Sequence, residues 1–587
     1  MQKWLYLTTS ICSILLLIIL HQLNEIPIDT GDGLAHYFIA NNSFSQPSDF
    51  LDHWGKPVFT MLSAPFAYFG FHVYVFFNIL IYTLSLFVAF KIFKHFRTQT
   101  PAIALFPLIL LGSLDYSSNV LGGMTEVLFG FFALLSGLLA LKKRWFWFAL
   151  LIAIMPYVRS EGQFLLPLAL IILTLNRALP YGVLFIIMFV FFGNVGWVTH
   201  EDFWWYFTQN PYKDAADIYG HGAWYHYITN WHLHLGLPGL LLLIFGLTLY
   251  IKNVFTRENH SENKFISLYF GAIYFGIIIV HSYLWAHGKN GALGLSRLAI
   301  HGLPGLVFIS ILALDSLRIK AWMNYFITGL MALVSLLCIY DYPFVHDKAF
   351  PKKAMPDELA VIDASIATLD YLKNNPAGKV YYYHPLVAYK TNVNLKDQKG
   401  RFIQKSFAAF DDEMVQLNTG DLIIWDSHFA KRDMNFPEEE TSRFEELFIF
   451  TPFNQMVHKG DAVSKVKVLR VNKSKSPSKQ TTKIIFDGKI NVSSDSLYTN
   501  LTRLSNKSGS KENFQLQITK TSGNGQIYFV IQHDATGQAL TFELDTNNAW
   551  KFSLPSDLLG EYKVFVHNPN GVVGEIEVKL QMWFPAN

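Results

Sequence analysis

The sequence predicts a polytopic α-helical membrane protein followed by a large soluble region outside the cytoplasm. Of its 587 residues, 51% are hydrophobic and 16% are charged, whereas soluble globular proteins carry nearer a quarter charged residues. Up to about Tyr340 the chain is a succession of apolar runs, such as Val73 to Phe90, which approach the ~20 residues that cross a bilayer core. Beyond Pro343 these runs stop, which indicates a change to soluble structure.

About eleven membrane spans are predicted from the apolar runs. The first run follows Lys3, but no small-residue cleavage site comes after it, so we expect a retained helix. The spans are 4–20, 73–90, 101–114, 124–141, 145–157, 162–176, 180–198, 234–251, 265–286, 300–314 and 321–341.

Lysine and arginine divide unevenly between the loops. If the N-terminus is inside, the inner loops hold thirteen of these residues and the outer loops up to Tyr340 hold five, as the positive-inside rule requires. An odd number of spans then puts everything after Pro343 outside. The inner residues are Lys3, Lys91, Lys94, Arg97, Lys142, Lys143, Arg144, Arg177, Lys252, Arg257, Lys264, Arg318 and Lys320, and the outer ones are Lys56, Arg159, Lys213, Lys289 and Arg297.

The soluble region divides into two predicted domains, after a transmembrane domain at 1–345. Residues 346–472 mix a helical pattern at 359–372 with short strands at 379–383 and 421–425, which indicates an α/β domain. A Ser/Lys-rich linker, Asn472 to Lys483, follows. Residues 473–587 contain alternating segments at 514–518, 526–531 and 575–580 between turn residues, which predict an immunoglobulin-like β-sandwich.

Charge and cysteine content exclude several classes of protein. The net charge of +3 is too small to indicate a nucleic-acid partner. Cys12 and Cys338 both lie in apolar segments, so they build neither a disulfide framework nor a metal knuckle. The outer loop at 199–233 is rich in histidine and aromatic residues, and we interpret it as interfacial packing, with metal ligation as the alternative.

Ionisable residues recur where spans meet the outer loops. Such residues are costly at a membrane face unless they are paired or functional. They include carboxylates and cations together, which is what transfer from a polyprenyl-phosphate sugar needs: a carboxylate deprotonates the acceptor hydroxyl, and cations stabilise the departing phosphate. The candidates are Asp29, Asp32, His36, His53, Lys56, Glu126, Arg159, Glu161 and Arg297.

The order of these motifs resembles that of GT-C glycosyltransferases, the group that includes protein O-mannosyltransferases and the aminoarabinose transferase of lipid A. Asp32 with His36-Tyr37 resembles the first-loop aspartate motif, and Lys56-Pro57 resembles the Lys-Pro element of the same loop. Thr125-Glu126 and Arg159-Ser160-Glu161-Gly162 resemble two paired bacterial elements, and Arg297 before Pro304 resembles an Arg that precedes the last conserved Pro. The likeness covers residues 1–345.

The resemblance implies the fold and the roles of these residues. Asp32 would be the general base, with Asp29 as the alternative, because Gly33 stands where a second acidic residue often follows the motif aspartate. Arg159, Arg297 and Lys56 would contact phosphate, with Glu161, His53, Glu126 and His36 as further substrate contacts. The missing acid favours a mechanism without metal or cofactor, and direct displacement implies inversion at the anomeric carbon.

Two other functions fit the same sequence. A polytopic transporter or assembly subunit would show inverted repeats and charges near the bilayer midplane, whereas most charges here lie at span ends. A polymerase or ligase for lipid-linked polysaccharide would differ only in its acceptor. For the transferase itself, the sequence leaves the acceptor open among protein, lipid and glycan. The soluble region of over two hundred residues has no cysteine, which favours a bacterial inner membrane and a role in the cell envelope.

Overall fold

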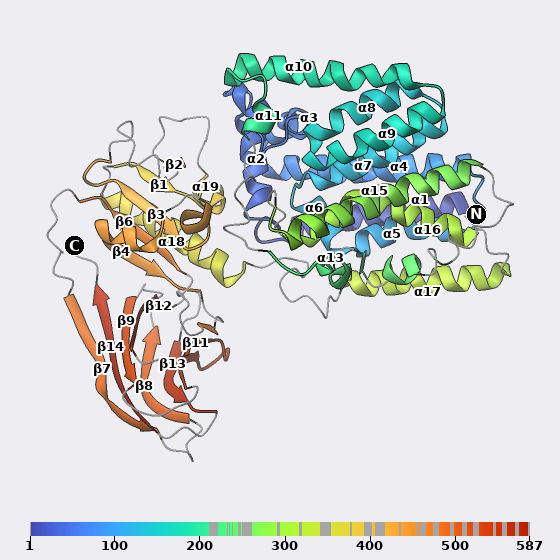
Figure 1. Ribbon diagram of the computed structural model, residues 1–587. Coiled ribbons are helices and arrows are strands. Elements are labelled where there is room, and N and C mark those ends of the chain that lie inside the picture. Colours follow the sequence, from blue (N-terminus) through green and yellow to red (C-terminus); the bar gives the residue numbers. More distant parts are fainter. Residues whose placement is uncertain are drawn as a thin grey trace. The chain divides into compact units, whose positions relative to one another are not determined.

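The computed structural model contains two units, Met1–Lys353 and Ala354–Asn587 (Figure 1). It describes residues 2–340 except 210–220, 290–293, 316–319 and most of 232–260. It also describes residues 354–584 except 376–377, 393–401, 405–416, 434–435, 453–455, 458–464, 473–480, 493–497, 507–512, 521–526, 544–546, 555–559 and 570–573. Half of the predicted span 234–251, most of the predicted linker, and Lys213, Lys252, Arg257 and Arg318 lie outside the described residues.

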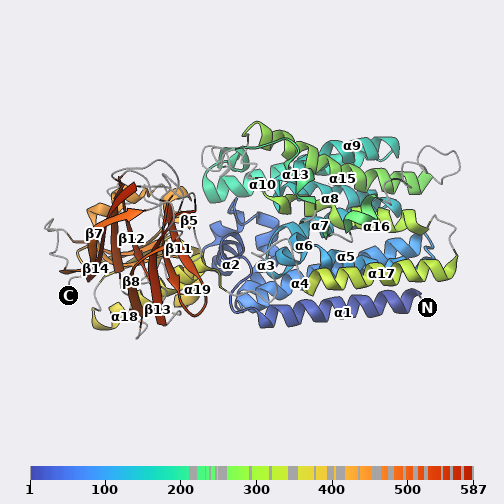
Figure 2. The same cartoon turned by 90° about the horizontal axis from the view of Figure 1, so that it is seen from below.

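The first unit is built from helices. Its long or apolar helices are α1 (Gln2–Leu23), α4 (Phe71–His95), α5 (Leu105–Gly112), α7 (Glu126–Leu141), α8 (Trp145–Val158), α9 (Leu165–Leu175), α10 (Val183–His200), α15 (Ser261–Ala286), α16 (Leu303–Asp315) and α17 (Ala321–Tyr340). Figure 2 shows α1, α4, α5 and α17 running alongside one another, and α1 contacts both α4 and α5.

Five described helices are long and apolar enough to cross a membrane, and a bent pair makes a sixth if it counts as one span. The bent pair is Pro101–Gly112 with α6 (Leu114–Leu121), which meet at 68°. Ser113 allows the bend because its hydroxyl accepts a hydrogen bond from the Tyr116 N–H at 3.2 Å and caps α6. This unit is therefore that of an integral membrane protein, with several further apolar helices that are shorter.

The first outer loop contains helical structure that the hydropathy pattern did not predict. It folds into α2 (Asp32–Asn42), the short η1 (Pro47–Leu51) and α3 (Pro57–Ala67). Pro57 occupies the first turn of α3, where the missing N–H of proline costs nothing. The connection after the third predicted span is also helical, because it forms α6.

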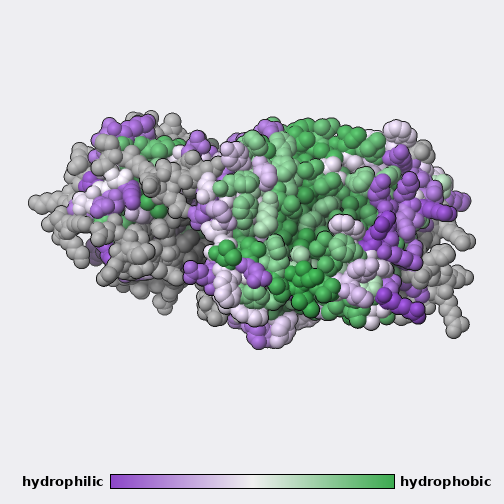
Figure 3. All heavy atoms as spheres, turned by 90° about the horizontal axis from the view of Figure 1, so that it is seen from above, coloured by the Kyte–Doolittle hydropathy of each residue, from purple (hydrophilic) through white to green (hydrophobic). Residues whose placement is uncertain are grey.

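Basic residues end several helices on the side opposite the first outer loop. Arg97, Lys143 and Arg177 follow the C-termini of α4, α7 and α9 with φ of 52°, 53° and 54°, in the left-handed region that closes helix ends. All three are exposed. Figure 3 shows a broad hydrophobic surface over the helices, with hydrophilic residues gathered toward the end of the unit that carries the N-terminus. The two ends of the helical unit are thus chemically distinct.

The second unit begins with an α/β region. One sheet has the order β2-β1-β3-β6-β4, in which β1 (Val380–Tyr382) is parallel to β2 (Phe402–Gln404) and β3 (Leu422–Asp426). β6 (Val466–Arg470) and β4 (Glu445–Phe450) complete it in antiparallel fashion. The helix α18 (Pro356–Asn374) contacts β3, β4 and β6. The predicted helix at 359–372 and strands at 379–383 and 421–425 are confirmed.

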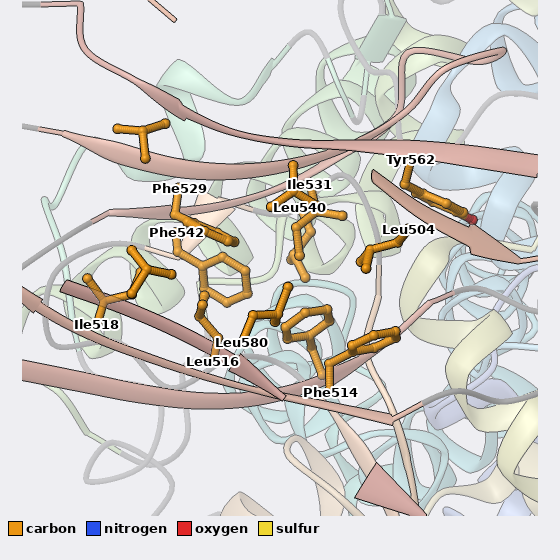
Figure 4. Packing of buried hydrophobic residues seen from close by; sticks show 14 of the residues in the cluster. Leu504, Phe514, Leu516, Ile518, Phe529, Ile531, Leu540, Phe542, Tyr562 and Leu580 are labelled. Carbon is orange, nitrogen blue, oxygen red and sulfur yellow. The ribbon is translucent and has the colours of Figure 1, made fainter. Parts of the chain in front are cut away.

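Two further sheets form a sandwich. One has the order β5-β11-β10-β13-β8 and the other β12-β9-β14-β7, with bounds β5 (Met456–Val457), β7 (Thr481–Val492), β8 (Tyr498–Asn506), β9 (Asn513–Lys520), β10 (Tyr528–His533), β11 (Ala539–Glu543), β12 (Asn547–Ser553), β13 (Gly560–His567) and β14 (Gly574–Phe584). Figure 4 shows the side chains that fill the space between the sheets, among them Phe514, Phe529 and Phe542. β5, which precedes residue 472, pairs with β11.

Candidate active site

The predicted site residues come from the same end of several helices. Asp29 follows α1, Glu126 begins α7, and Arg159 follows α8. Arg297 lies in the short η5 (Ser296–Gly302) that leads into α16. Antiparallel helices bring such positions together, so segments more than two hundred and fifty residues apart in the sequence meet here.

Arg297 joins three carboxylates. Its Nη1 lies 3.4 Å from Asp29 Oδ2, its Nη2 is hydrogen-bonded to Asp32 Oδ2, and its Nε lies 3.3 Å from Glu126 Oε1. A guanidinium has five N–H donors, so this arrangement leaves donors for a further ligand. Arg297 thus pairs with all three carboxylates at once.

Arg159 forms the second half of the network. Its Nη1 lies 3.0 Å from Glu126 Oε1 and donates to Thr125 Oγ1 at 2.7 Å. Its Nε and Nη2 donate to the two oxygens of Glu161 at 3.3 and 3.2 Å, which is the bidentate geometry that gives Arg–carboxylate pairs their strength. Glu126 is fully buried and faces both Arg159 and Arg297. It thus holds the two guanidinium groups near one another.

Asp29 and Asp32 differ in their contacts. Asp29 Oδ1 accepts hydrogen bonds from the backbone N–H groups of Gly31 and Gly33 at 3.1 and 2.8 Å, so this carboxylate shapes the turn into α2. Among the described residues, Asp32 bonds only through Oδ2, to Arg297. Burial raises the pKa of Asp32, but the charge and the hydrogen bond of Arg297, with a contribution from His36, together outweigh burial, so the pKa is lowered overall and the group is ionised at neutral pH. Asp32 Oδ1 is available for a proton.

Lys56 approaches the arginines from the first outer loop. It precedes α3 with φ of 63°, a strained conformation for a residue with a side chain. Its Nζ donates to the His53 carbonyl oxygen at 2.9 Å, and the residue is 4% exposed. Burial, helped by the charge of Arg159, lowers the pKa of Lys56 to about 7, against the opposing effect of Glu161. Its charge is therefore titratable near neutral pH.

His53 and His36 are neutral members of the cluster. His53 Nε2 lies 3.0 Å from the Tyr206 carbonyl oxygen, and its ring stacks on that of Tyr206, which ties the first loop to α11 (Trp205–Thr208). Burial lowers the pKa of His53 and of His36 to about 4. His36 lies close enough to Asp32 to interact with its charge.

The structure therefore brings all the predicted site residues to one end of the helical unit. It adds others that the sequence reading did not select. Thr125 receives a hydrogen bond from Arg159, His281 Nε2 lies 3.6 Å from Glu161 Oε1, and His301 is buried beside the same acids. Thr125 and His301 had a signal in the sequence, since Thr125 precedes Glu126 in its motif and His301 stands four residues after Arg297.

Gly33 has a structural role at this site. A Cβ added there would overlap the carbonyl oxygen of Gly122 and meet Asp29 Cβ at 3.0 Å. The position that holds a second acid in the resembled motif thus has no room for a side chain here. Within the described residues, no three or more His, Cys, Asp or Glu side chains are placed to hold a metal ion.

Comparisons with known proteins give structural similarity alone. No family model and no curated protein matches the sequence. ArnT from Cupriavidus metallidurans is similar in two crystal structures, bound to undecaprenyl phosphate and in the apo state. The lipid-bound structure has a TM-score of 0.49 and 11% identity, over 80% of this chain and 99% of ArnT. The apo structure has a TM-score of 0.47 and 10% identity, over 79% of this chain and 97% of ArnT. Arabinosyltransferase EmbB from Mycobacterium smegmatis has a TM-score of 0.35 and 9% identity, over 98% of this chain and 64% of EmbB. This chain is thus similar in structure to ArnT and EmbB at low sequence identity.

Proposed function

We propose that this protein is a membrane glycosyltransferase that moves a hexosyl or pentosyl group from a polyprenyl-phosphate donor to an acceptor outside the cytoplasm. The observation that carries the proposal is the pair of arginines, Arg159 and Arg297, joined through buried Glu126. Fixed guanidinium groups at a membrane face suit a lipid phosphate, whose charge grows as the glycosidic bond breaks.

The reaction we propose uses Asp32 as the general base. Asp32 takes the proton of the acceptor hydroxyl, the acceptor oxygen bonds to the anomeric carbon, and the bond from that carbon to the phosphate oxygen breaks. Polyprenyl phosphate leaves with the electron pair, and the configuration at the anomeric carbon inverts. Arg297, Arg159 and Lys56 offset the charge on the departing phosphate, so the proposed mechanism needs no metal.

Donor binding would also activate the base. In the structure Arg297 is bonded to Asp32, and its charge holds the pKa of Asp32 down. A phosphate near Arg297 neutralises part of that charge, so the pKa of Asp32 rises and the carboxylate becomes a stronger base once the donor is in place. The remaining predicted contacts, His36 and His53, orient the first loop around Asp32 and Arg297.

The position of the charges separates this proposal from a transporter. The charged cluster lies at helix ends, whereas a transporter places its binding groups near the bilayer midplane. A polymerase or ligase for lipid-linked polysaccharide would use the same donor chemistry, and the acceptor that becomes glycosylated distinguishes it.

The direct test is transfer by the purified full chain with polyprenyl-phosphate sugars, with and without EDTA. We expect Asp32→Asn to reduce turnover by about 10²- to 10⁴-fold while donor binding is kept, because the amide keeps the shape but cannot take a proton. Asp29→Asn is the matched control, since the amide oxygen can still accept the backbone hydrogen bonds of Gly31 and Gly33. If only Asp29→Asn lost turnover, Asp29 would be the base. Full activity in both variants would refute the glycosyltransferase proposal.

A further inference from the structure

A second group of buried polar side chains gathers around Glu161, which pairs with Arg159. We call it the Glu161 cluster: Tyr227 from α13 (His226–Thr229), His281 from α15, His301 from η5, and Glu161 itself. The four residues are between 0% and 8% exposed. His281 Nε2 lies 3.6 Å from Glu161 Oε1, the rings of Tyr227 and His281 are 6.3 Å apart, and His301 lies close enough to feel the charges of Glu161 and His281.

Several polar atoms of this cluster have no hydrogen-bond partner among the described residues. These buried atoms are Tyr227 Oη, His281 Nδ1 and His301 Nε2, whereas His281 Nε2 faces Glu161. Buried polar groups in native proteins almost always have a partner. Three elements supply these atoms to one place beside the proposed reaction centre, which indicates a site for a polar ligand.

The chemistry of the cluster matches sugar hydroxyls. A phenol and a neutral imidazole can each donate and accept a hydrogen bond, as a hydroxyl can. Arg159 already faces Glu161 with two N–H groups, so the cluster offers little net charge to an ion. Trp285, four residues after His281 on the same face of α15, adds an aromatic ring whose Nε1 has no partner among the described residues. An aromatic face beside hydrogen-bonding groups suits a sugar ring.

We propose that the Glu161 cluster binds the neutral sugar carried by the donor, an inference that rests on the proposed function. Arg159 contacts both Glu161 and Glu126, and Glu126 contacts Arg297. A phosphate held by these arginines therefore has its sugar within reach of Tyr227 and His281. A uronic acid would bring a carboxylate to a cluster whose acid, Glu161, already occupies the N–H groups of Arg159 that face it, so an anionic sugar is disfavoured.

The experiment measures binding of two kinds of probe to the purified full chain. One is undecaprenyl phosphate, and the other is undecaprenyl phosphate that carries a glucosyl, mannosyl, arabinosyl or glucuronosyl group. We expect at least one neutral glycosyl donor to bind more tightly than the bare lipid, and the glucuronosyl donor to bind less tightly than the neutral ones. Tyr227→Phe and His281→Gln should each weaken binding of the preferred donor by about tenfold and leave undecaprenyl phosphate binding unchanged.

The control variant is Tyr269→Phe, a buried tyrosine of α15 that bonds Ser136 at 2.6 Å and lies roughly 18 Å along the helix from His281. It should leave both affinities unchanged. Equal losses for both probes in Tyr227→Phe and His281→Gln would assign these residues a structural role and overturn the proposal. A rise in the acceptor KM alone in these variants would also overturn the proposal. The proposal would fail as well if the wild-type chain bound every glycosyl donor no better than undecaprenyl phosphate. If the chain bound neither kind of probe, the proposed function itself would fail.

Discussion

Two side chains at the candidate site, those of Lys56 and Glu126, are charged groups buried in the protein. Lys56 is buried and has a positive φ. Glu126 is a buried carboxylate between two guanidinium groups. Removing one partner of such a buried charge network leaves the others uncompensated, which is why these networks tolerate few substitutions. A strained residue at a charged cluster points to function because the surrounding structure must maintain it.

The charge of Lys56 makes activity depend on pH. Its pKa of about 7 means that the ammonium form prevails below pH 7 and is lost above it. We expect kcat/KM for the donor to fall as the pH rises through about 7, because the free enzyme loses a phosphate contact. In Lys56→Arg the fall should disappear, since a guanidinium stays charged. An unchanged profile in Lys56→Arg would contradict the role of Lys56.

The same shift has an opposite effect on stability. Because the pKa of Lys56 is lower in the folded protein than in the unfolded chain, the unfolded chain binds more protons between about pH 7 and pH 10. The contribution of Lys56 to folding therefore becomes more favourable as the pH rises through this range. Activity and stability thus have opposite pH trends at this residue.

At the scale of elements, the site depends on how closely α2 approaches α6. The backbone at Gly33 packs against the carbonyl oxygen of Gly122, the C-cap of α6. This contact holds Asp29 and Asp32 in front of Arg297. The first outer loop is therefore a folded part of the helical unit and not a flexible connection.

A methyl group at Gly33 would separate these two elements. We expect Gly33→Ala to destabilise the protein by about 1–3 kcal/mol, the usual cost of overpacking, and to reduce transfer at least tenfold. Gly271→Ala in α15 is the control, since its added Cβ meets no atom of the described residues within 4 Å. Thermal unfolding in detergent and transfer rates measure both effects. Equal behaviour of the two variants would mean that the approach of α2 to α6 is unimportant.

At the scale of the whole molecule, the chain has a helical unit that carries the charged cluster and a second unit rich in strands. The sandwich contains a large apolar core between its sheets (Figure 4). The contacts given above for the candidate site all join described residues of the helical unit. The two units therefore allow separate tests of orientation and of catalysis.

The first of these tests concerns orientation. We expect alkaline phosphatase fused after Pro343 or after Asn587 to be active, because the Lys/Arg distribution places these points outside the cytoplasm. A fusion after Lys142, an exposed residue at the opposite end of α7 from Glu126, should be inactive. The reverse pattern would put the charged cluster on the cytoplasmic face and refute its proposed role.

The second test concerns the sandwich. We expect a chain that ends at residue 480 to retain sugar transfer, because the candidate site lies in the helical unit. β5 would lose its partner β11, so the variant should be less stable in thermal unfolding. Its fold in the membrane is checked by size exclusion and donor binding. A truncated chain that binds donor but no longer transfers sugar would assign the sandwich a part in catalysis or acceptor binding.

Much of this architecture follows from the sequence because its signals are local. Apolar runs predict the long helices at 73–90 and 265–286, since burying a helix in lipid needs about twenty apolar residues in a row. Alternation predicts β9 and β14, since successive side chains of a strand face opposite sides. The charged residues at helix ends were predictable as a group, because ions are costly anywhere deeper in a membrane.

Only the tertiary structure shows the features that depend on packing between distant parts of the sequence. The helices of the first loop and the pairing of β5 with β11 depend on contacts between segments distant in the sequence. The same is true of the site: the sequence presents Asp29, Asp32, Glu126 and Arg297 as separate loop charges, and only packing joins them. His281 lay in a predicted span and Tyr227 in an aromatic outer loop interpreted as interfacial packing, because a buried polar atom becomes notable only when its neighbours in space are known.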